Sequence, residues 1–427
     1  LCQKSNQVKV PHLRIHITHC LDRFILRHTA LCGPARASVM TSTLVTTHGF
    51  HSHISDREVQ ARGKEMGTGT LPEFFKNHGY HVMAVGKLFH HHVPPGTVDE
   101  SGGRGKWDRH PKGRQKYKDG KTLTDWARWP RKEEEMADAK AADWASKRLA
   151  KDYDQPFLMM VGFLRPHVPW IVPDRYFDLY PKPEQLKMPP YKPDDLDDVP
   201  ERSRFLNIST EMPDTDTLIR KEQWNEVIHA YLASCSFADH HLGRVLDALK
   251  SGPEADNTII VLWSDHGYHL GEKGTFQKHS LWERSSHVPL VFAGPGIEPK
   301  QVSGRPVSLI DLLPTLAELC GLPSKEAWEG RSLTPLIKHP EKEWPHPVVT
   351  TWQGRNYAIQ TERFRYITYD DGSEELYDHQ NDLDEWNNLA QQAAFASLKA
   401  QLRKSVPDTY EERVPGQLQD RAGEKAK

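Results

Sequence analysis

The chain has 427 residues, and its 56 Lys and Arg against 58 Asp and Glu give a formal charge of −2 at pH 7. This balance excludes a dedicated nucleic-acid arm and a supercharged tail, since both need a large excess of one sign. The apolar runs are far shorter than the roughly 18 residues of a membrane span, so no membrane crossing is expected. Five cysteines are too few for a disulfide framework, and the odd number leaves at least one unpaired or modified.

Short apolar strand patterns alternate with helical patterns along most of the chain, which predicts parallel βαβ units. Apolar residues at helical spacing run from Trp224 to Leu249. The run from Thr258 to Trp263 is the best candidate for a central strand, and the strand at 157–163 is expected to be buried. In chain order, the predicted elements are a helix at 71–77, a strand at 81–85, a helix at 133–150, a strand at 157–163, a helix at 224–249, strands at 258–263 and 288–292, and a helix at 309–319.

The pattern changes after about Trp344 to short strands separated by turn signals. Asp370-Asp371-Gly372 is typical of a hairpin turn. The predicted elements of this part are strands at 348–352, 357–360 and 364–369 and a helix near 394–402. We therefore divide the chain into a larger α/β domain at 1–343, a smaller α+β subdomain at 344–410, and a charged tail at 411–427 that is expected to be disordered.

Cys32 lies in the segment Leu-Cys-Gly-Pro-Ala-Arg at 31–36. Pro34 suits the first turn of a helix, so Cys32 is expected just before a helix N-terminus and within reach of Arg36. A thiol in that setting would be polarised or ionised. The Cys-x5-Arg pattern of a phosphatase is excluded because the sixth residue after Cys32 is Ser38. A buried structural cysteine is the alternative interpretation.

Two further segments place cationic or imidazole side chains after predicted strands, where open α/β sheets bind their ligands. Lys87 and His90 follow the strand at 81–85. They could bind an anion and move a proton, or they could belong to a solvated His-rich loop. His167 follows the strand at 157–163, in a loop made rigid by two prolines. The alternative for His167 is a packed loop histidine.

Asp265 and His266 directly follow the predicted central strand at 258–263. A carboxylate and an imidazole at a strand end make a natural half of a metal site. An Asp that only caps the next segment would give the same pattern. Lys278 stands about a dozen residues further along the chain and has no distinction of its own.

Taken in this order, the motifs resemble those of the type I sulfatases, particularly the iduronate-2-sulfatase-like branch, from the Cys32 segment to about Leu389. The spacing Cys32-x-Pro34-x-Arg36 is the signature of that family, although Ala35 stands where the family usually has Ser. The resemblance implies an alkaline-phosphatase-like α/β fold, with a mixed, mostly parallel sheet flanked by helices. It also implies that a formylglycine-generating enzyme oxidises Cys32 to formylglycine.

The family's activity carries over to these positions as a set of expected roles. The resemblance implies a sulfuric ester hydrolase acting on a sulfated carbohydrate, in which residue 32, as a formylglycine hydrate, attacks sulfur and forms a covalent sulfate. Lys87 and Lys278 would hold the sulfate, and Arg36 would steady the nucleophile. An unmodified cysteine could not complete this reaction.

The remaining expected roles concern proton transfer and the metal. His167, alone or together with Lys278, would protonate the leaving oxygen, and His90 would remove the proton that allows sulfate to depart. Asp265, His266 and residue 32 would be ligands of Ca²⁺ or Mg²⁺.

The family normally has, well upstream of the cysteine, a strand that ends in two adjacent aspartates, which complete the metal site. Only 31 residues precede Cys32, and no Asp-Asp pair lies among them. Leu1 is not an initiator Met and no leader pattern follows it. We therefore interpret the chain as truncated at its N-terminus, with the first strand of the larger domain missing. Since a hard cation prefers roughly six to eight oxygen ligands, the metal site is expected to be incomplete.

Eight basic residues against two acidic ones lie between Ser101 and Lys121. This insertion could contact a polyanionic substrate, or it could be a solvated loop. The basic residues are Arg104, Lys106, Arg109, Lys112, Arg114, Lys116, Lys118 and Lys121.

Two functional alternatives remain at this stage: a phosphate or phosphonate ester hydrolase on the same scaffold, and a catalytically impaired sulfatase-like binding protein. The family is usually matured on exported proteins, which implies a periplasmic or secreted location, or the lysosome in an animal. Asn207-Ile208-Ser209 is a candidate glycosylation acceptor.

Overall fold

The computed structural model describes residues 25–27, 30–107, 124–129, 132–208, 212–412 and 414. Its α-helices are α1 (Cys32–Thr41), α2 (Val45–His48), α3 (Asp56–Glu65), α4 (Leu71–Asn77), α5 (Ala137–Leu149), α6 (Asp174–Phe177), α7 (Glu201–Asn207), α8 (Thr215–Arg220), α9 (Trp224–Lys250), α10 (Glu283–Ser286), α11 (Leu312–Leu319), α12 (Thr334–Lys338) and α13 (Ala396–Arg403). Its strands are β1 (Ile25–Arg27), β2 (His81–Gly86), β3 (Glu100–Gly103), β4 (Trp126–Arg128), β5 (Phe157–Gly162), β6 (Trp170–Val172), β7 (Ile260–Trp263), β8 (Leu290–Ala293), β9 (Pro306–Ser308), β10 (Val348–Thr351), β11 (Tyr357–Gln360), β12 (Phe364–Thr368) and β13 (Glu374–Asp378).

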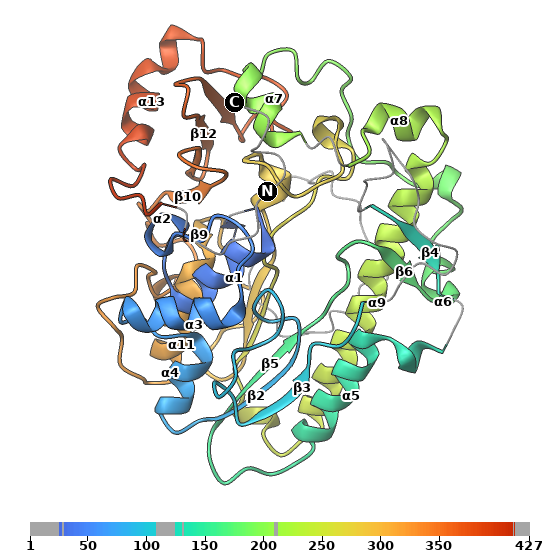
Figure 1. Ribbon diagram of the computed structural model, residues 1–427, viewed down its shortest axis with the longest axis vertical. Helices are drawn as coiled ribbons and strands as arrows, with labels where there is room; N and C mark the ends of the chain where they lie inside the picture. Colours follow the sequence, from blue (N-terminus) through green and yellow to red (C-terminus); the bar gives the residue numbers. More distant parts are fainter. Residues whose placement is uncertain are drawn as a thin grey trace.

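The larger part of the chain is layered, with helices on both faces of a parallel sheet ordered β3-β2-β5. Successive residues of β2 point to opposite faces, as the two-residue period of a strand requires. Val82 and Ala84 pack with α1 and α4, whereas Val85 packs with α5 and α9. Figure 1 shows the same arrangement, with α5 and α9 on one side of the strands and α1, α3, α4 and α11 on the other.

The predicted burial of β5 and the predicted central position of β7 are both wrong for the described residues. Every residue of β5 and of β7 is half-buried. In the described part of the chain, β5 is the edge of its three-stranded sheet, and β7 pairs only with β8, in antiparallel orientation. An edge strand lacks a strand neighbour on one side, which explains the partial exposure of these apolar side chains.

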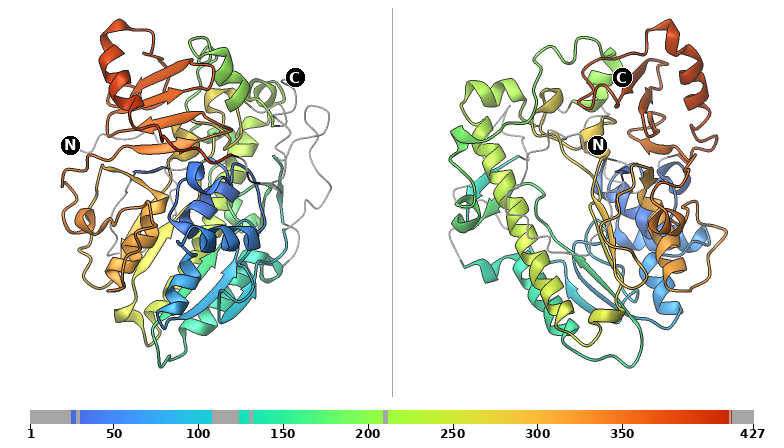
Figure 2. Two further views of the ribbon diagram at one scale, coloured as in Figure 1. Left: turned by 60° about the vertical axis from the view of Figure 1, so that its left-hand side comes forward. Right: turned by 180° about the vertical axis from the view of Figure 1, so that it is seen from behind.

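The C-terminal part forms an antiparallel meander of the strands β10, β11, β12 and β13, covered by α13 (Figure 2). The predicted hairpin turn joins β12 to β13, and the Gly372 N–H donates to the Tyr369 carbonyl at 3.0 Å. The predicted elements of this part therefore form. The proposed domain boundaries remain a prediction. Most of the predicted tail at 411–427 lies outside the described residues.

Asn207 is fully buried at the end of α7, which contradicts its role as a glycosylation acceptor. Its amide nitrogen donates to the Tyr369 hydroxyl at 2.9 Å, and its amide oxygen accepts from the Leu281 N–H at 3.1 Å. A glycan needs an exposed side chain. This asparagine instead joins α7 to the C-terminal sheet.

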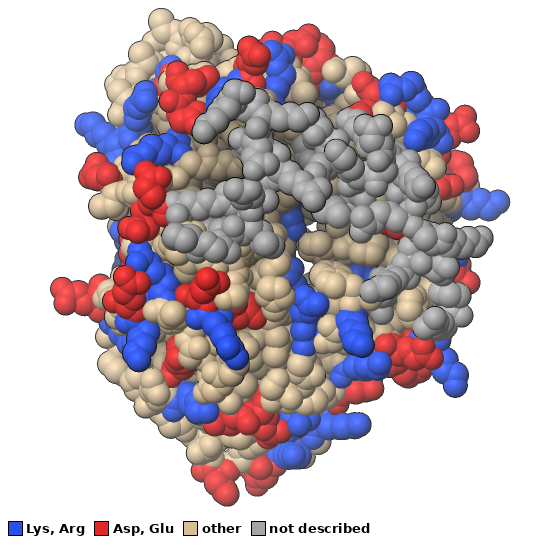
Figure 3. All heavy atoms as spheres, in the orientation of Figure 1, with Lys and Arg blue, Asp and Glu red and all other residues tan. Residues whose placement is uncertain are grey.

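Several composition-based expectations can be compared with the described residues. Among their helices, none combines the length and apolarity needed to cross a membrane. Cys32, Cys235 and Cys320 are free thiols, whereas Cys2 and Cys20 lie outside the described residues. On the face shown in Figure 3, Lys and Arg are interspersed with Asp and Glu over the described surface, in keeping with the net charge near zero.

Candidate active site

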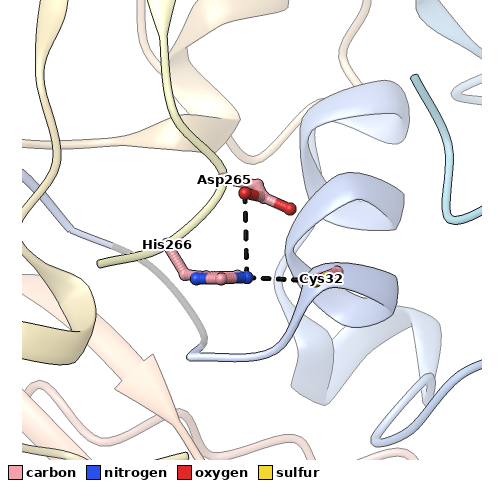
Figure 4. Close-up of side chains that lie close together, drawn as sticks. All are labelled: Cys32, Asp265 and His266. Carbon is pink, nitrogen blue, oxygen red and sulfur yellow. Dashed lines mark hydrogen bonds and ion pairs between the residues drawn. The ribbon is translucent and has the colours of Figure 1, made fainter. Parts of the chain in front are cut away.

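Cys32 is the first residue of α1, one position further into the helix than predicted. Its side chain is buried, and Sγ lies 3.0 Å from His266 Nε2 and 2.9 Å from Lys278 Nζ. Figure 4 shows the Cys32 side chain directed from α1 toward His266, which stands on the segment after β7. Burial alone would raise the pKa of this thiol, but the charges of Lys278 and Lys87 outweigh burial and hold the pKa well below its ordinary value.

His167 and Lys278 form a hydrogen-bonded pair beside Cys32. His167 Nδ1 lies 2.6 Å from the Val168 carbonyl oxygen, which can only accept, so Nδ1 carries the proton. His167 Nε2 then presents its lone pair to Lys278 Nζ at 3.0 Å. Burial and the charge of Lys278 lower the pKa of His167 to about 4, so this ring is neutral at pH 7. The ammonium group of Lys278 therefore donates to both its neighbours.

Arg36 joins three of the predicted motifs. Its Nε donates to Asp265 at 2.7 Å, and its Nη1 donates to the backbone carbonyls of Lys87 and Leu88, both at 2.7 Å. Burial would raise the pKa of the Asp265 carboxyl, but Arg36 holds it well below its usual range. The described hydrogen bonds of Arg36 thus fix the ends of β2 and β7 relative to α1, instead of contacting Cys32 itself.

Lys87 leaves the end of β2, where β2 and β5 approach each other closely. A Cβ atom at Gly86 would collide with the Gly162 carbonyl, so glycine is required at this position. The Lys87 side chain is buried, and that burial lowers its pKa. His90 lies two residues beyond Leu88 and stacks on His53, with 3.8 Å between ring centroids. Burial and the neighbouring His53 lower the pKa of His90 to about 2.

Three residues near this site had not been predicted as functional: His53, His279 and Trp107. His53 Nδ1 lies 2.8 Å from where a Cβ on Gly33 would be, so the ring packs against the first turn of α1. His279 is half-buried and stacks on Trp352, and desolvation together with the charge of Lys278 lowers its pKa to about 3. Trp107 lies 5.1 Å from the His167 ring. Two features of the sequence could have found them: His279 adjoins Lys278, and His53 lies close to His48 and His51.

A metal could be held by Cys32, Asp265 and His266, whose donor atoms all lie within 4.8 Å of one another. This trio offers one thiol, one imidazole and a carboxylate whose Oδ2 already accepts from Arg36 at 2.7 Å. Ca²⁺ and Mg²⁺ prefer oxygen ligands, and six or more of them. These three residues alone therefore do not fit either ion.

Two family models match the chain. The sulfatase model matches residues 22–322, and the model for the C-terminal part of N-sulphoglucosamine sulphohydrolase matches residues 271–412. The chain belongs to the sulfatase family. It is 42% identical over 393 residues to a sulfatase from Formosa agariphila, a match that covers 89% of this chain and 77% of the relative. It is 28% identical over 374 residues to iduronate 2-sulfatase from Homo sapiens, which covers 75% of this chain and 66% of that protein.

Solved structures with the same fold include hydrolases of two ester types. A 2-O GAG sulfatase is similar with a TM-score of 0.68 and 21% identity, covering 90% of this chain and 82% of that one. A phosphonate monoester hydrolase from Silicibacter pomeroyi has a TM-score of 0.71 and 21% identity, covering 93% and 89%. These likenesses confirm the predicted alkaline-phosphatase-like α/β fold. Family membership identifies this sulfatase as an enzyme that hydrolyses sulfuric esters.

Proposed function

We propose that this sulfatase removes sulfate from a sulfated carbohydrate and that residue 32 acts as formylglycine. The observation that carries the proposal is the position of Cys32 Sγ, which lies 2.9 Å from Lys278 Nζ and 3.0 Å from His266 Nε2. A formylglycine oxygen at this position would accept a hydrogen bond from Lys278 Nζ. His266 Nδ1 lies 2.8 Å from the Gly267 carbonyl oxygen and so carries the proton, which leaves Nε2 to accept from a hydroxyl of the hydrated aldehyde. When formed, the hydrated aldehyde supplies one hydroxyl that attacks sulfur and a second that loses its proton as sulfate leaves.

The lysine side chains around residue 32 are suited to binding the sulfate group. Lys278 and the buried Lys87 both act electrostatically on Cys32, and anions with charge developing on oxygen are stabilised by such preorganised donors. Arg36 holds the loop that carries Lys87 and the Asp265 segment in register with α1.

His167, Lys278 and His90 carry out the proton transfers. Because His167 is neutral at pH 7 and accepts from Lys278, the proton for the leaving sugar oxygen is stored on the Lys278–His167 pair instead of on His167 alone. His90, with its lowered pKa, is unprotonated and can accept the proton of the remaining hydroxyl.

The carbohydrate substrate is supported by a relative that is an iduronate 2-sulfatase and by a structural neighbour that is a 2-O GAG sulfatase. We also propose that a formylglycine-generating enzyme matures Cys32, in a periplasmic, secreted or lysosomal protein. A Ca²⁺ or Mg²⁺ ion beside residue 32 would need further oxygen ligands in addition to Cys32, Asp265 and His266. The metal content of the purified protein, with Asp265→Asn as the comparison, tests that last point.

The decisive experiment combines mass spectrometry with an ester assay. We expect the peptide that contains residue 32 to carry an aldehyde in place of the thiol-bearing carbon, and the protein to hydrolyse an aryl sulfate and a 2-O-sulfated glycosaminoglycan disaccharide. Cys32→Ala should abolish turnover of both. A converted protein that hydrolyses aryl phosphate or phosphonate better than aryl sulfate would refute the proposal, and so would an unconverted protein that still cleaves sulfate.

A further inference from the structure

Trp107 is the one aromatic residue outside the predicted motifs whose described ring contacts are both with proposed active-site residues. Its indole ring lies 5.1 Å from the imidazole of His167, tilted by 49°, and Lys87 Nζ stands 5.9 Å from its ring centroid. The side chain is half-buried, so part of the ring surface is open. By contrast, Trp170, Trp282 and Trp352 are buried in apolar clusters.

The backbone between β3 and Trp107 is shaped to bring this ring to the site. Gly103 has φ +70° and Gly105 has φ +79°, both in the left-handed region that favours glycine. A Cβ on Gly105 would also stand 2.8 Å from the Ala137 Cβ, which blocks larger residues there. Because β3 runs parallel to β2, the turn after β3 arrives beside the end of β2, where Lys87 begins.

We propose that Trp107 is the stacking surface for the sugar ring that carries the sulfate ester, an inference that rests on the proposed function. A pyranose has an apolar C–H face and a polar rim, and the face of an indole is electron-rich. That face attracts polarised C–H groups and the Lys87 ammonium but repels a sulfate. The sulfate is therefore directed toward Lys87 and Lys278, while the sugar ring lies against Trp107.

This arrangement also gives His167 a defined place relative to the substrate. His167 contacts Trp107 on one side and Lys278 on the other. A sugar stacked on Trp107 with its sulfate between the lysines would present the bridging ester oxygen near the Lys278–His167 pair. Sites for small ligands commonly combine one such aromatic wall with a few fixed polar groups. Trp107 thus acts as a specificity-determining residue for carbohydrate over other sulfate esters.

Equilibrium binding separates this role from catalysis. The parent protein is the full chain with Cys32→Ala, which cannot form formylglycine and cannot turn substrate over. Calorimetric titrations would use a 2-O-sulfated glycosaminoglycan disaccharide, the same disaccharide without sulfate, and inorganic sulfate. Trp107→Ala should weaken binding of the sulfated disaccharide about tenfold, the upper range for an aromatic contact, and Trp107→Phe should weaken it about threefold. Binding of inorganic sulfate should change less than about twofold, because the lysines remain.

Trp344→Ala is the matched control, since Trp344 is also half-buried and its described ring contact is with His346. It should leave all three affinities unchanged. Equal disaccharide affinity in the parent and in Trp107→Ala would overturn the inference. Equal weakening for the disaccharide and for inorganic sulfate would also overturn it, because Trp107 would then act only by supporting Lys87. A different result would refute the proposed function alone: the disaccharide binds through Trp107, but the unmutated protein does not release its sulfate.

Discussion

At the scale of single residues, the site is organised by shared contacts more than by the individual motifs. Lys278 touches both Cys32 and His167, and Arg36 contacts Asp265 together with the backbone after β2. Residues that act through common partners give non-additive effects when mutated. Each variant is therefore most informative when it is compared across substrates or with a conservative substitution.

The neutral state of His167 leads to a prediction about leaving groups. His167→Ala should lower kcat for a sulfated disaccharide by roughly 10² to 10⁴, the range of general acid–base catalysis. The same variant should lose much less on an aryl sulfate with an acidic phenol, because that leaving oxygen needs no proton. Steady-state kinetics with both substrates check this. An equal loss on both would mean that His167 positions Lys278 and does not take part in proton delivery.

His53 supports His90 through their stacked rings. Substitutions that remove or keep a flat ring at position 53 test this contact. His53→Ala removes the stacking partner and should lower kcat about tenfold with little change in KM, since the contact is with a proposed base and not with sulfate. His53→Phe keeps a flat ring and should recover most of kcat. If Phe is as damaging as Ala, the imidazole itself is required and the stacking role is wrong.

Some of these residues could be predicted from the sequence and others could not. The difference depends on whether local structure or a long-range contact places the residue in the site. Cys32, Lys87 and Asp265 each follow a strand or begin a helix, so local sequence patterns locate them. His53 and Trp107 reach the site only through contacts between segments distant in the chain, and no local pattern encodes such contacts. Lys278 has no distinctive sequence context, so only the resemblance to the family indicated it. The same resemblance supplied the expected roles of the other residues.

At the scale of elements, a buried ionic network attaches the C-terminal sheet to the segment that follows Lys278. Arg365 on β12 is fully buried and pairs with Glu283 of α10 at 2.5 Å and with Glu385 at 2.8 Å. Its Nη1 also donates to the Leu281 carbonyl at 2.7 Å. The C-terminal sheet therefore supports the loop that carries Lys278. The strands of this sheet were predictable from their alternation, but this network was not, because its charges come from three separate segments.

Arg365→Met should destabilise the protein by about 3–5 kcal/mol, the cost of leaving buried carboxylates without their partner. It should also lower activity through the Lys278 segment. Arg363→Met is the control: Arg363 lies two residues away on the same part of the chain and pairs with Asp378 in a half-exposed position, so its loss should matter much less. Thermal unfolding and aryl sulfate turnover measure both effects. Similar destabilisation by the two variants would contradict the assignment of Arg365 as the linking residue.

At the scale of the whole molecule, histidines with lowered pKa values make the stability of the fold depend on pH. Burial is the first cause that lowers the pKa of His269 to about 3 and that of His240 to about 4, against about 6.5 for an exposed ring. Between these values the unfolded chain binds more protons than the folded protein, so stability rises with pH and is lost as the pH falls. Asp195 and Asp311, with pKa values raised to about 6 by burial, act in the opposite direction. Further histidines whose pKa values are lowered first by desolvation act in the same direction as His269, and they are His53, His90, His167 and His279.

His269 isolates one part of this effect because it is fully buried, and its Nε2 is bonded to the Ser280 hydroxyl at 2.9 Å. Lowering the pH from 7.5 to 5 should cost about 2 kcal/mol through His269 alone, since the unfolded ring becomes protonated and the folded ring does not. His269→Gln should be less stable at pH 7.5 but should lose about 2 kcal/mol less than the unmutated protein on acidification. Thermal unfolding midpoints of both proteins at the two pH values provide the comparison. If both proteins lose the same stability, His269 is protonated in the folded state at pH 5 and its environment is more polar than the structure shows.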